Sequence, residues 1–138
     1  MESATPAPSL LVVDDDEGLR LLMADQLREE GYSVETAADS REAVARLDRR
    51  APDLLVLDLK LPDAEGPELI ARLQRDRAAV PFIVVTGRGD ERAAVEVMQR
   101  GALDYVMKDS DLLARMPAVV RRALDAVSRD RALRAAQA

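Results

Sequence analysis

The chain has 138 residues, of which 48% are hydrophobic and 33% charged, and its net charge is −6. This length and composition suit one globular domain with one core, and the negative charge argues against nonspecific nucleic-acid binding, which requires a basic surface. The absence of cysteine and histidine excludes disulfides, thiolate or imidazole metal sites and a phosphohistidine on this chain.

Residues 1–8 are small, polar and proline-containing, and we expect them to form a flexible leader. They lack the basic-then-apolar order of a signal peptide, and no apolar run in the chain is long enough to span a membrane. We therefore expect a cytoplasmic protein that makes no membrane contact.

Five apolar runs predict strands, and each is followed by a segment with helical periodicity. The runs are residues 10–13, 33–36, 54–57, 81–86 and 104–108. Regular alternation of strand and helix predicts a parallel sheet covered on both faces, with right-handed crossovers. The strand-end residues described below can act together if strands 1, 3, 4 and 5 are adjacent, and the order 2-1-3-4-5 achieves this. We therefore predict a doubly wound α/β fold with five strands and five helices.

The last two helices carry specific expectations. Ala94, Val95 and Met98 are expected to face the core in the fourth helix. We expect Pro117 to begin the main body of the last helix, because an interior proline costs about 3 kcal/mol. Apolar periodicity fades after Ser128, while Asp–Arg pairs continue at helical spacing. The sequence thus predicts a domain over residues 9–128 and a helical extension over residues 129–138.

Polar side chains stand where four of the predicted strands end. Asp14 and Asp15 follow the first strand, Asp58 the third, Thr86 the fourth and Lys108 the fifth. The carboxyl ends of parallel strands share one crevice. Two carboxylates about 4 Å apart repel by roughly 4 kcal/mol at an effective dielectric of 20, so three of them require a cation. Oxygen ligands without histidine or cysteine favour Mg²⁺.

A cation beside an accessible carboxylate is an arrangement for phosphoryl transfer. Asp58 would be the covalent acceptor, Lys108 would supply a compact positive charge and Thr86 a hydroxyl. Each residue also has a simpler interpretation: an acidic surface loop for residues 14–17, a solvated lysine, and a loop cap. Only the combination of these residues favours the chemistry.

The combined motif resembles the receiver domain of two-component response regulators. It consists of Val13-Asp14-Asp15, Asp58-x-x-x-Pro62-x-x-x-Gly66, Thr86 and Tyr105-x-x-Lys108. The resemblance implies a flavodoxin-like fold and a signalling domain rather than an enzyme. It also implies phosphorylation of Asp58 by a histidine kinase or phosphotransfer protein, with Mg²⁺. Asp15 and Asp58 would bind the metal directly, Asp14 through water, and Lys60 through its backbone carbonyl.

The same resemblance implies a switch. Thr86 would turn toward the phosphoryl group and Tyr105 would move inward, which alters the surface of the fourth helix, fifth strand and fifth helix. That surface would contact a downstream protein, a C-terminal output domain or a second copy of the chain. Lys60 and Arg88 are expected to flank the line of water attack and to set the lifetime of the phosphoryl group.

One residue departs from the family pattern. Asp109 stands where receivers usually have proline after the lysine. We expect a trans Lys108–Asp109 bond, because a cis bond before a non-proline residue costs about 2.5–4 kcal/mol. The negative charge of Asp109 is expected to weaken the binding of the phosphoryl group by Lys108.

Two other functions remain possible from the sequence. Asp14-x-Asp16 with Thr86 also resembles haloacid-dehalogenase-like phosphatases, which would make Asp14 the nucleophile. The third possibility is an interaction module that is not phosphorylated.

Overall fold

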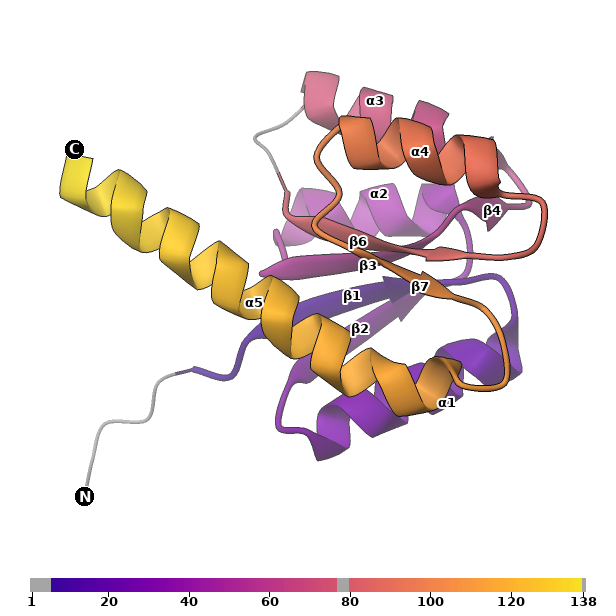
Figure 1. Ribbon diagram of the computed structural model, residues 1–138, viewed down its shortest axis with the longest axis horizontal. Coiled ribbons are helices and arrows are strands. Elements are labelled where there is room, and N and C mark those ends of the chain that lie inside the picture. The colour runs from indigo at the N-terminus through magenta and orange to yellow at the C-terminus, as the bar shows by residue number, and fades with distance from the viewer. Residues whose placement is uncertain (1–5, 77–79, 138) are drawn as a thin grey trace.

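The strands and helices follow the alternation of apolar runs and helical periodicity, and they assemble into a layered α/β fold (Figure 1). The computed structural model describes residues 6–76 and 80–137. Its main sheet has the order β2-β1-β3-β6-β7, and all neighbouring strands are parallel. These strands are β1 Ser9–Val13, β2 Ser33–Ala37, β3 Leu54–Asp58, β6 Phe82–Thr86 and β7 Tyr105–Met107. The predicted order 2-1-3-4-5 is confirmed.

Five helices cover the two faces of this sheet, as predicted. They are α1 Glu17–Glu29, α2 Ser40–Arg49, α3 Gly66–Asp76, α4 Glu91–Gln99 and α5 Leu112–Gln137. In Figure 1, α1 and α5 lie on one face, and α2, α3 and α4 on the other. Two core clusters correspond to these two layers. Every residue of β3 and β6 is buried because both faces of these strands are covered. No described helix is long and apolar enough to cross a membrane.

A short hairpin after β3, which the sequence did not predict, shapes the loop beside Asp58. In this hairpin β4 Lys60–Leu61 pairs antiparallel with β5 Ala64–Glu65. The Gly66 N–H donates to the Leu59 carbonyl at 2.8 Å. A Cβ on Gly66 would lie only 3.0 Å from the Leu59 backbone, so glycine permits this close approach. The hairpin therefore returns the chain to the position next to Asp58.

The same loop is attached to α2 through Asp63. Its carboxylate accepts hydrogen bonds from the N–H groups of Ser40 at 2.9 Å and Arg41 at 3.1 Å, and from the Ser40 hydroxyl at 2.8 Å. The N–H of Ser40 is the main cause that lowers the pKa of Asp63. Asp63 thus supplies a negative charge at the positive end of α2, in addition to the local cap from Asp39.

The predicted inward face of α4 is partly wrong. Val97 is the fully buried residue of this helix, whereas Val95 is 58% exposed and Met98 is 38% exposed. Ala94 is partly buried against the core, together with Ala93. Both sets of residues fit a helical repeat, so the repeat alone does not fix the rotation of the helix. In the structure the face with Ala93, Ala94 and Val97 packs against the core.

The prediction that the last helix begins at Pro117 is wrong, because α5 begins at Leu112 and Pro117 lies inside it. A proline at this position has no N–H to donate to the Leu113 carbonyl four residues earlier. The Gln26 side chain of α1 donates its Nε2–H to that carbonyl instead. A neighbouring helix therefore replaces the missing donor and lets the helix continue through the proline.

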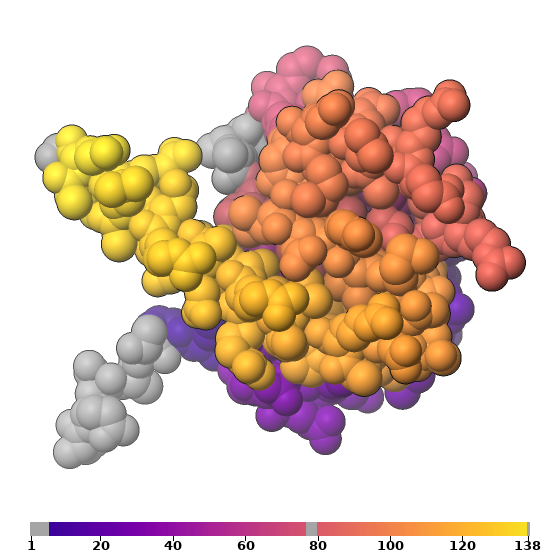
Figure 2. Space-filling model, in the orientation of Figure 1, coloured from indigo at the N-terminus to yellow at the C-terminus, as the bar shows by residue number. Residues whose placement is uncertain are grey.

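The end of α5 extends beyond the core. Residues 128–137 are all exposed, and Figure 2 shows this part of the helix projecting from the body of the domain. Arg131 forms an ion pair with Asp53 at 2.8 Å, and Arg134 pairs with Asp130 at 2.9 Å. This agrees with the expectation that surface pairs continue the helix. The expected flexible leader falls largely on residues 1–5, which lie outside the described residues.

We predict that Gln26→Met lowers the free energy of unfolding by about 1 kcal/mol, because the Leu113 carbonyl loses its donor. In a P117A background the residue at 117 regains an N–H for the same carbonyl, so the loss should become smaller. Urea unfolding of the four chains measures this coupling.

Gln74→Met serves as a control for that experiment. Gln74 donates to the Arg100 carbonyl at 2.7 Å, but this bond is exposed and water can replace the amide. We expect almost no loss of stability from this variant. Equal losses from Gln26→Met with and without Pro117 would contradict the assignment.

Candidate functional site

Three carboxylates meet at the carboxyl ends of β1 and β3. Asp14 and Asp15 directly follow β1, and Asp58 is the last residue of β3. The two strands are parallel neighbours with Val13 beside Leu57, so their ends lie at the same edge of the sheet. Each carboxylate has an oxygen within 4.8 Å of the other two. Asp14 and Asp58 are buried and Asp15 is exposed. The predicted convergence of these residues is confirmed.

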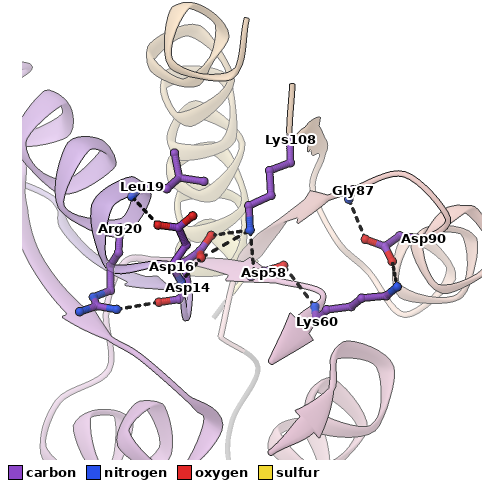
Figure 3. A network of polar contacts seen from close by, with 9 residues as sticks. All are labelled: Asp14, Asp16, Leu19, Arg20, Asp58, Lys60, Gly87, Asp90 and Lys108. Atoms are coloured by element: carbon purple, nitrogen blue, oxygen red, sulfur yellow. Dashed lines mark hydrogen bonds and ion pairs between the residues drawn. The ribbon is translucent and has the colours of Figure 1, made fainter. Parts of the chain in front are cut away.

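Lys108 brings the positive charge to this cluster from the end of β7. Its Nζ lies 3.1 Å from Asp58 Oδ2 and 3.2 Å from Asp14 Oδ2. Its backbone N–H donates to the Thr86 carbonyl at 2.7 Å, which aligns the strand ends. Figure 3 shows the lysine side chain reaching between the two carboxylates. One ammonium therefore serves two buried negative charges.

Backbone donors orient the second oxygen of each buried carboxylate. The Asp16 N–H donates to Asp14 Oδ1 at 2.8 Å, and the Lys60 N–H donates to Asp58 Oδ1 at 3.1 Å. The guanidinium of Arg20 in α1 donates to the Asp14 carbonyl at 3.0 Å and holds this part of the loop. Arg20 was missed in the sequence, because no local pattern indicates a hydrogen bond from a helical arginine to the backbone carbonyl of a loop residue. Both carboxylates thus have a fixed orientation.

Burial and mutual repulsion shift the titration of these groups. Burial is the main cause that raises the pKa of Asp14. Burial also raises the pKa of Asp58; the Lys60 N–H opposes this effect and the Asp14 charge adds to it. For Lys108, burial acts to lower the pKa, but the charges of Asp58 and Asp14 outweigh it and raise the pKa. The cluster therefore retains an excess of negative charge that a cation would relieve.

The donor set fits a hard divalent cation. Asp14 Oδ2 is buried and makes no hydrogen bond of good geometry to the described residues; its contact is the Lys108 ammonium at 3.2 Å. A buried oxygen without a hydrogen bond is costly, and metal coordination is one way to satisfy it. Three carboxylates offer oxygen ligands alone, which suit Mg²⁺ or Ca²⁺ rather than a soft metal.

Thr86 and Tyr105 lie together on the α4 side of the site. Thr86 is buried at the end of β6, and its hydroxyl donates to Met107 Sδ at 3.3 Å. Tyr105 is 49% exposed and lines a groove of about 520 Å³ together with Thr86, Met107 and residues of α4 such as Met98. The hydroxyl is thus engaged with β7, and the tyrosine side chain lies in the outer position.

Lys60 and Arg88 lie in the two loops beside the cluster, and Arg88 is exposed. The Lys60 ammonium lies 3.2 Å from Asp90 Oδ1, whereas its backbone N–H contacts Asp58. Asp90 is only 4% exposed and also accepts the Gly87 N–H at 2.6 Å. Asp90 was missed in the sequence, where an acidic residue before a helix indicates an ordinary cap.

Asp109 follows the lysine through a trans bond, as expected, because residues 80–137 contain no cis peptide. Its carboxylate accepts the Asp111 N–H at 2.9 Å and pairs with Arg115 at 3.4 Å. The negative charge of Asp109 is therefore directed toward the start of α5. That Asp109 weakens the grip of Lys108 stays a prediction.

Comparison with known proteins identifies the family. Residues 10–120 match the model of the response regulator receiver domain. The chain belongs to this family. It is thus a receiver domain of two-component signalling, a signalling module rather than an enzyme. This membership replaces the alternative assignment to haloacid-dehalogenase-like phosphatases.

The receiver domain is similar to transcriptional regulators and to solved receivers. It is 41% identical over 121 residues to the phosphate regulon transcriptional regulatory protein PhoB of Rhizobium meliloti, covering 84% of this chain and 53% of that protein. It is 40% identical over 116 residues to the transcriptional regulatory protein TcrA of Mycobacterium tuberculosis, covering 82% and 46%. The chain thus spans about half the length of these relatives.

Solved structures agree with this family. A CheY-like receiver domain protein from Methanospirillum hungatei superposes with a TM-score of 0.82 at 31% identity, covering 90% of this chain and 98% of that one. NtrX from Brucella abortus gives a TM-score of 0.84 at 32% identity over 92% of this chain and 29% of that one. The fold and the family assignment are thus consistent.

We predict that Asp58→Asn stabilises the metal-free domain by about 1 kcal/mol near neutral pH, because it removes one buried charge. The pKa of Asp58 is raised above its ordinary value of 3.8, so the stability that its protonated form contributes is lost as the pH rises through the raised pKa. The advantage of the variant should therefore shrink as the pH falls toward 3.8. Thermal unfolding across the acid range measures it.

Asp53→Asn is the control for this experiment. Asp53 accepts the Ser9 N–H and pairs with Arg131, each at 2.8 Å, and these partners outweigh burial and lower its pKa. This variant should lose stability near neutral pH. Destabilisation by both variants would contradict the excess of charge at Asp58.

Proposed function

We propose that this receiver domain accepts a phosphoryl group on Asp58 in an Mg²⁺-dependent reaction. The observation that carries the proposal is the position of Asp58, 3.1 Å from the Lys108 ammonium and within 4.8 Å of the Asp14 and Asp15 carboxylates. One Asp58 oxygen attacks the phosphorus of the donor, and the bond from phosphorus to the donor atom breaks. A histidine kinase or phosphotransfer protein would supply the donor phosphohistidine.

The metal would be held by the acidic cluster. Asp15 and Asp58 would bind it directly, Asp14 through water, and Lys60 through its backbone carbonyl. When bound, Mg²⁺ neutralises charge on the transferring phosphoryl group. The excess negative charge of the cluster supports this assignment, because the single ammonium of Lys108 faces two buried carboxylates.

Lys108 and Thr86 would bind the phosphoryl oxygens. Lys108 already faces Asp58, so its ammonium can move from the carboxylate to a phosphoryl oxygen with little rearrangement. Thr86 must first break its bond to Met107, which is weak because a thioether sulfur is a poor acceptor. Phosphorylation would therefore change the contact between β6 and β7.

This change would reach a partner through the surface of α4, β7 and α5. When Thr86 turns toward the phosphoryl group, Tyr105 can enter the groove beside α4. The surface carries exposed apolar side chains that suit a protein partner: Val95, Met98, Leu103, Tyr105 and Met107. The partner would be a downstream protein, a C-terminal output domain or a second copy of the chain.

In this proposal the receiver domain covers residues 9–128, and residues 129–138 form a helical extension. The transfer of the phosphoryl group takes place in the cytoplasm.

We predict that acetyl phosphate with Mg²⁺ adds one phosphoryl group to the wild-type chain and none to Asp58→Asn, because among the described carboxylates Lys108 pairs with Asp58 and Asp14, and Asp14 is fully buried. Intact-mass measurement detects the adduct, and EDTA should abolish it. Asp25→Asn, at an exposed position of α1, is the control and should be modified like the wild type. A phosphoryl group on Asp14 in the Asp58→Asn variant would contradict the proposal.

Lys60 and Arg88 are expected to set the lifetime of the phosphoryl group, because their loops border the approach of water to Asp58. We predict a several-fold change in the dephosphorylation rate for K60M and for R88A, measured after removal of the donor. R41A, at an exposed position of α2, is the control. Unchanged kinetics in both variants would refute this role.

A further inference from the structure

Asp90 carries a buried carboxylate that the proposed chemistry does not use. It lies in the loop between β6 and α4, and it is 4% exposed. Its Oδ2 accepts the Gly87 N–H at 2.6 Å, and its Oδ1 lies 3.2 Å from the Lys60 ammonium. Oδ1 makes no hydrogen bond of good geometry within the described residues, so its contact is the charge of Lys60. A buried carboxylate with this environment depends on that ammonium.

Asp90 does not perform the usual task of an acidic residue before a helix. Its φ of −97° and ψ of 10° differ from the extended conformation of a cap, and its side chain makes no hydrogen bond to the first turn of α4. The carboxylate instead turns back toward Gly87, the residue that follows Thr86. Helix capping therefore does not account for this carboxylate.

Lys60 connects Asp90 to the phosphoacceptor. Its backbone N–H donates to Asp58 Oδ1 at 3.1 Å, so its side chain begins beside the reacting carboxylate. Figure 3 shows that side chain extending away from Asp58 toward Asp90. The lysine side chain is 64% exposed and has a flexible four-carbon stem, so its ammonium is free to change partner.

We propose that Asp90 is a positioning residue that holds the Lys60 ammonium and the Gly87 amide away from Asp58 in the resting domain. The inference rests on the proposed phosphorylation of Asp58. The Asp90 carboxylate is an anion bound by an ammonium and a backbone N–H, and a phosphoryl group binds the same two kinds of donor. A phosphoryl group carries nearly two negative charges, so it competes with the single charge of Asp90 for the ammonium.

Release of Lys60 from Asp90 would connect the phosphoryl group to α4. Asp90 lies directly before the first residue of this helix and accepts the amide that follows Thr86. When its carboxylate loses the ammonium, the loop of residues 87–90 loses one of its attachments to β4. The ion pair is weak enough to exchange because its lysine is exposed to solvent.

The test uses D90N, which keeps the shape of the side chain and removes its charge. Phosphorylation of D90N by acetyl phosphate with Mg²⁺ should be about threefold faster than that of the wild type, a change of the size expected for an ion pair whose lysine is exposed to solvent. High salt should reduce the difference. In a K60M background, D90N should have no effect, whereas in a K60R background it should again accelerate the reaction.

E96Q is the matched control, because Glu96 lies on the same helix and pairs with Arg100 at 3.8 Å. It removes one charge and one ion pair but should leave the rate unchanged. Equal rates for D90N and the wild type, or an equal effect of D90N with and without Lys60, would overturn the inference while phosphorylation of Asp58 stands. Failure of the wild type to accept any phosphoryl group would instead overturn the proposed function.

A second measurement does not depend on the folding of D90N. The chain contains only two lysines, Lys60 and Lys108, so NMR of lysine side chains labelled at Cε gives two resolvable signals. The Lys60 signal of the wild type should move on phosphorylation. If D90N folds, its resting Lys60 signal should already be displaced in the same direction. A Lys60 signal that does not move on phosphorylation would overturn the inference.

Discussion

The structure depends on an imbalance of charge at one edge of the sheet. Asp14 and Asp58 are buried within reach of a single ammonium, that of Lys108. Such a cluster is unfavourable by itself, because burial and repulsion both oppose its ionised form. It persists because β1 and β3 are tightly packed parallel neighbours whose ends cannot separate without opening the core. Packing energy elsewhere in the domain thus maintains a site that favours the arrival of a cation and a phosphoryl group.

In the loops around this edge, the hydrogen-bond and ion-pair donors are bound to three different carboxylates, those of Asp14, Asp58 and Asp90. The N–H groups that follow Asp14 and Asp58 orient those carboxylates, while Lys60 and Gly87 serve Asp90. In Figure 3 the Lys108 ammonium contacts the carboxylates of Asp14 and Asp58, whereas the Arg20 guanidinium contacts the Asp14 carbonyl and the Lys60 ammonium contacts Asp90. In the proposed function, phosphorylation would redistribute these existing donors and so favour one of two packings of the domain.

The sequence was sufficient for the topology and for the cluster, and insufficient for details that depend on distant contacts. The strand order followed from the requirement that Asp14, Asp58 and Lys108 meet, since the order 2-1-3-4-5 places the strands that carry them side by side. The rotation of α4 could not be predicted, because residues 93, 94 and 97 fit a helical repeat as well as Ala94, Val95 and Met98 do. The prediction at Pro117 was wrong, because proline has no N–H for the Leu113 carbonyl and the Gln26 side chain, 87 residues before Leu113, donates to that carbonyl instead. The Lys60–Asp90 pair joins two loops, and no local pattern indicates such a contact.

The length of α5 has a mechanical consequence. Its 26 residues correspond to about 39 Å at 1.5 Å per residue, and the part from 128 to 137 makes no contribution to the core. Buried residues from Leu112 to Val127 hold the first part of this helix against the core, so a small tilt of that part would displace Gln137 by a larger distance. The Arg131–Asp53 ion pair attaches this projecting part to the domain, and Asp53 directly precedes β3, the strand that ends at Asp58. Charged contacts therefore stand at both ends of β3: Asp58 at its last position pairs with Lys108, and Asp53, directly before its first residue, pairs with Arg131 of the projecting helix.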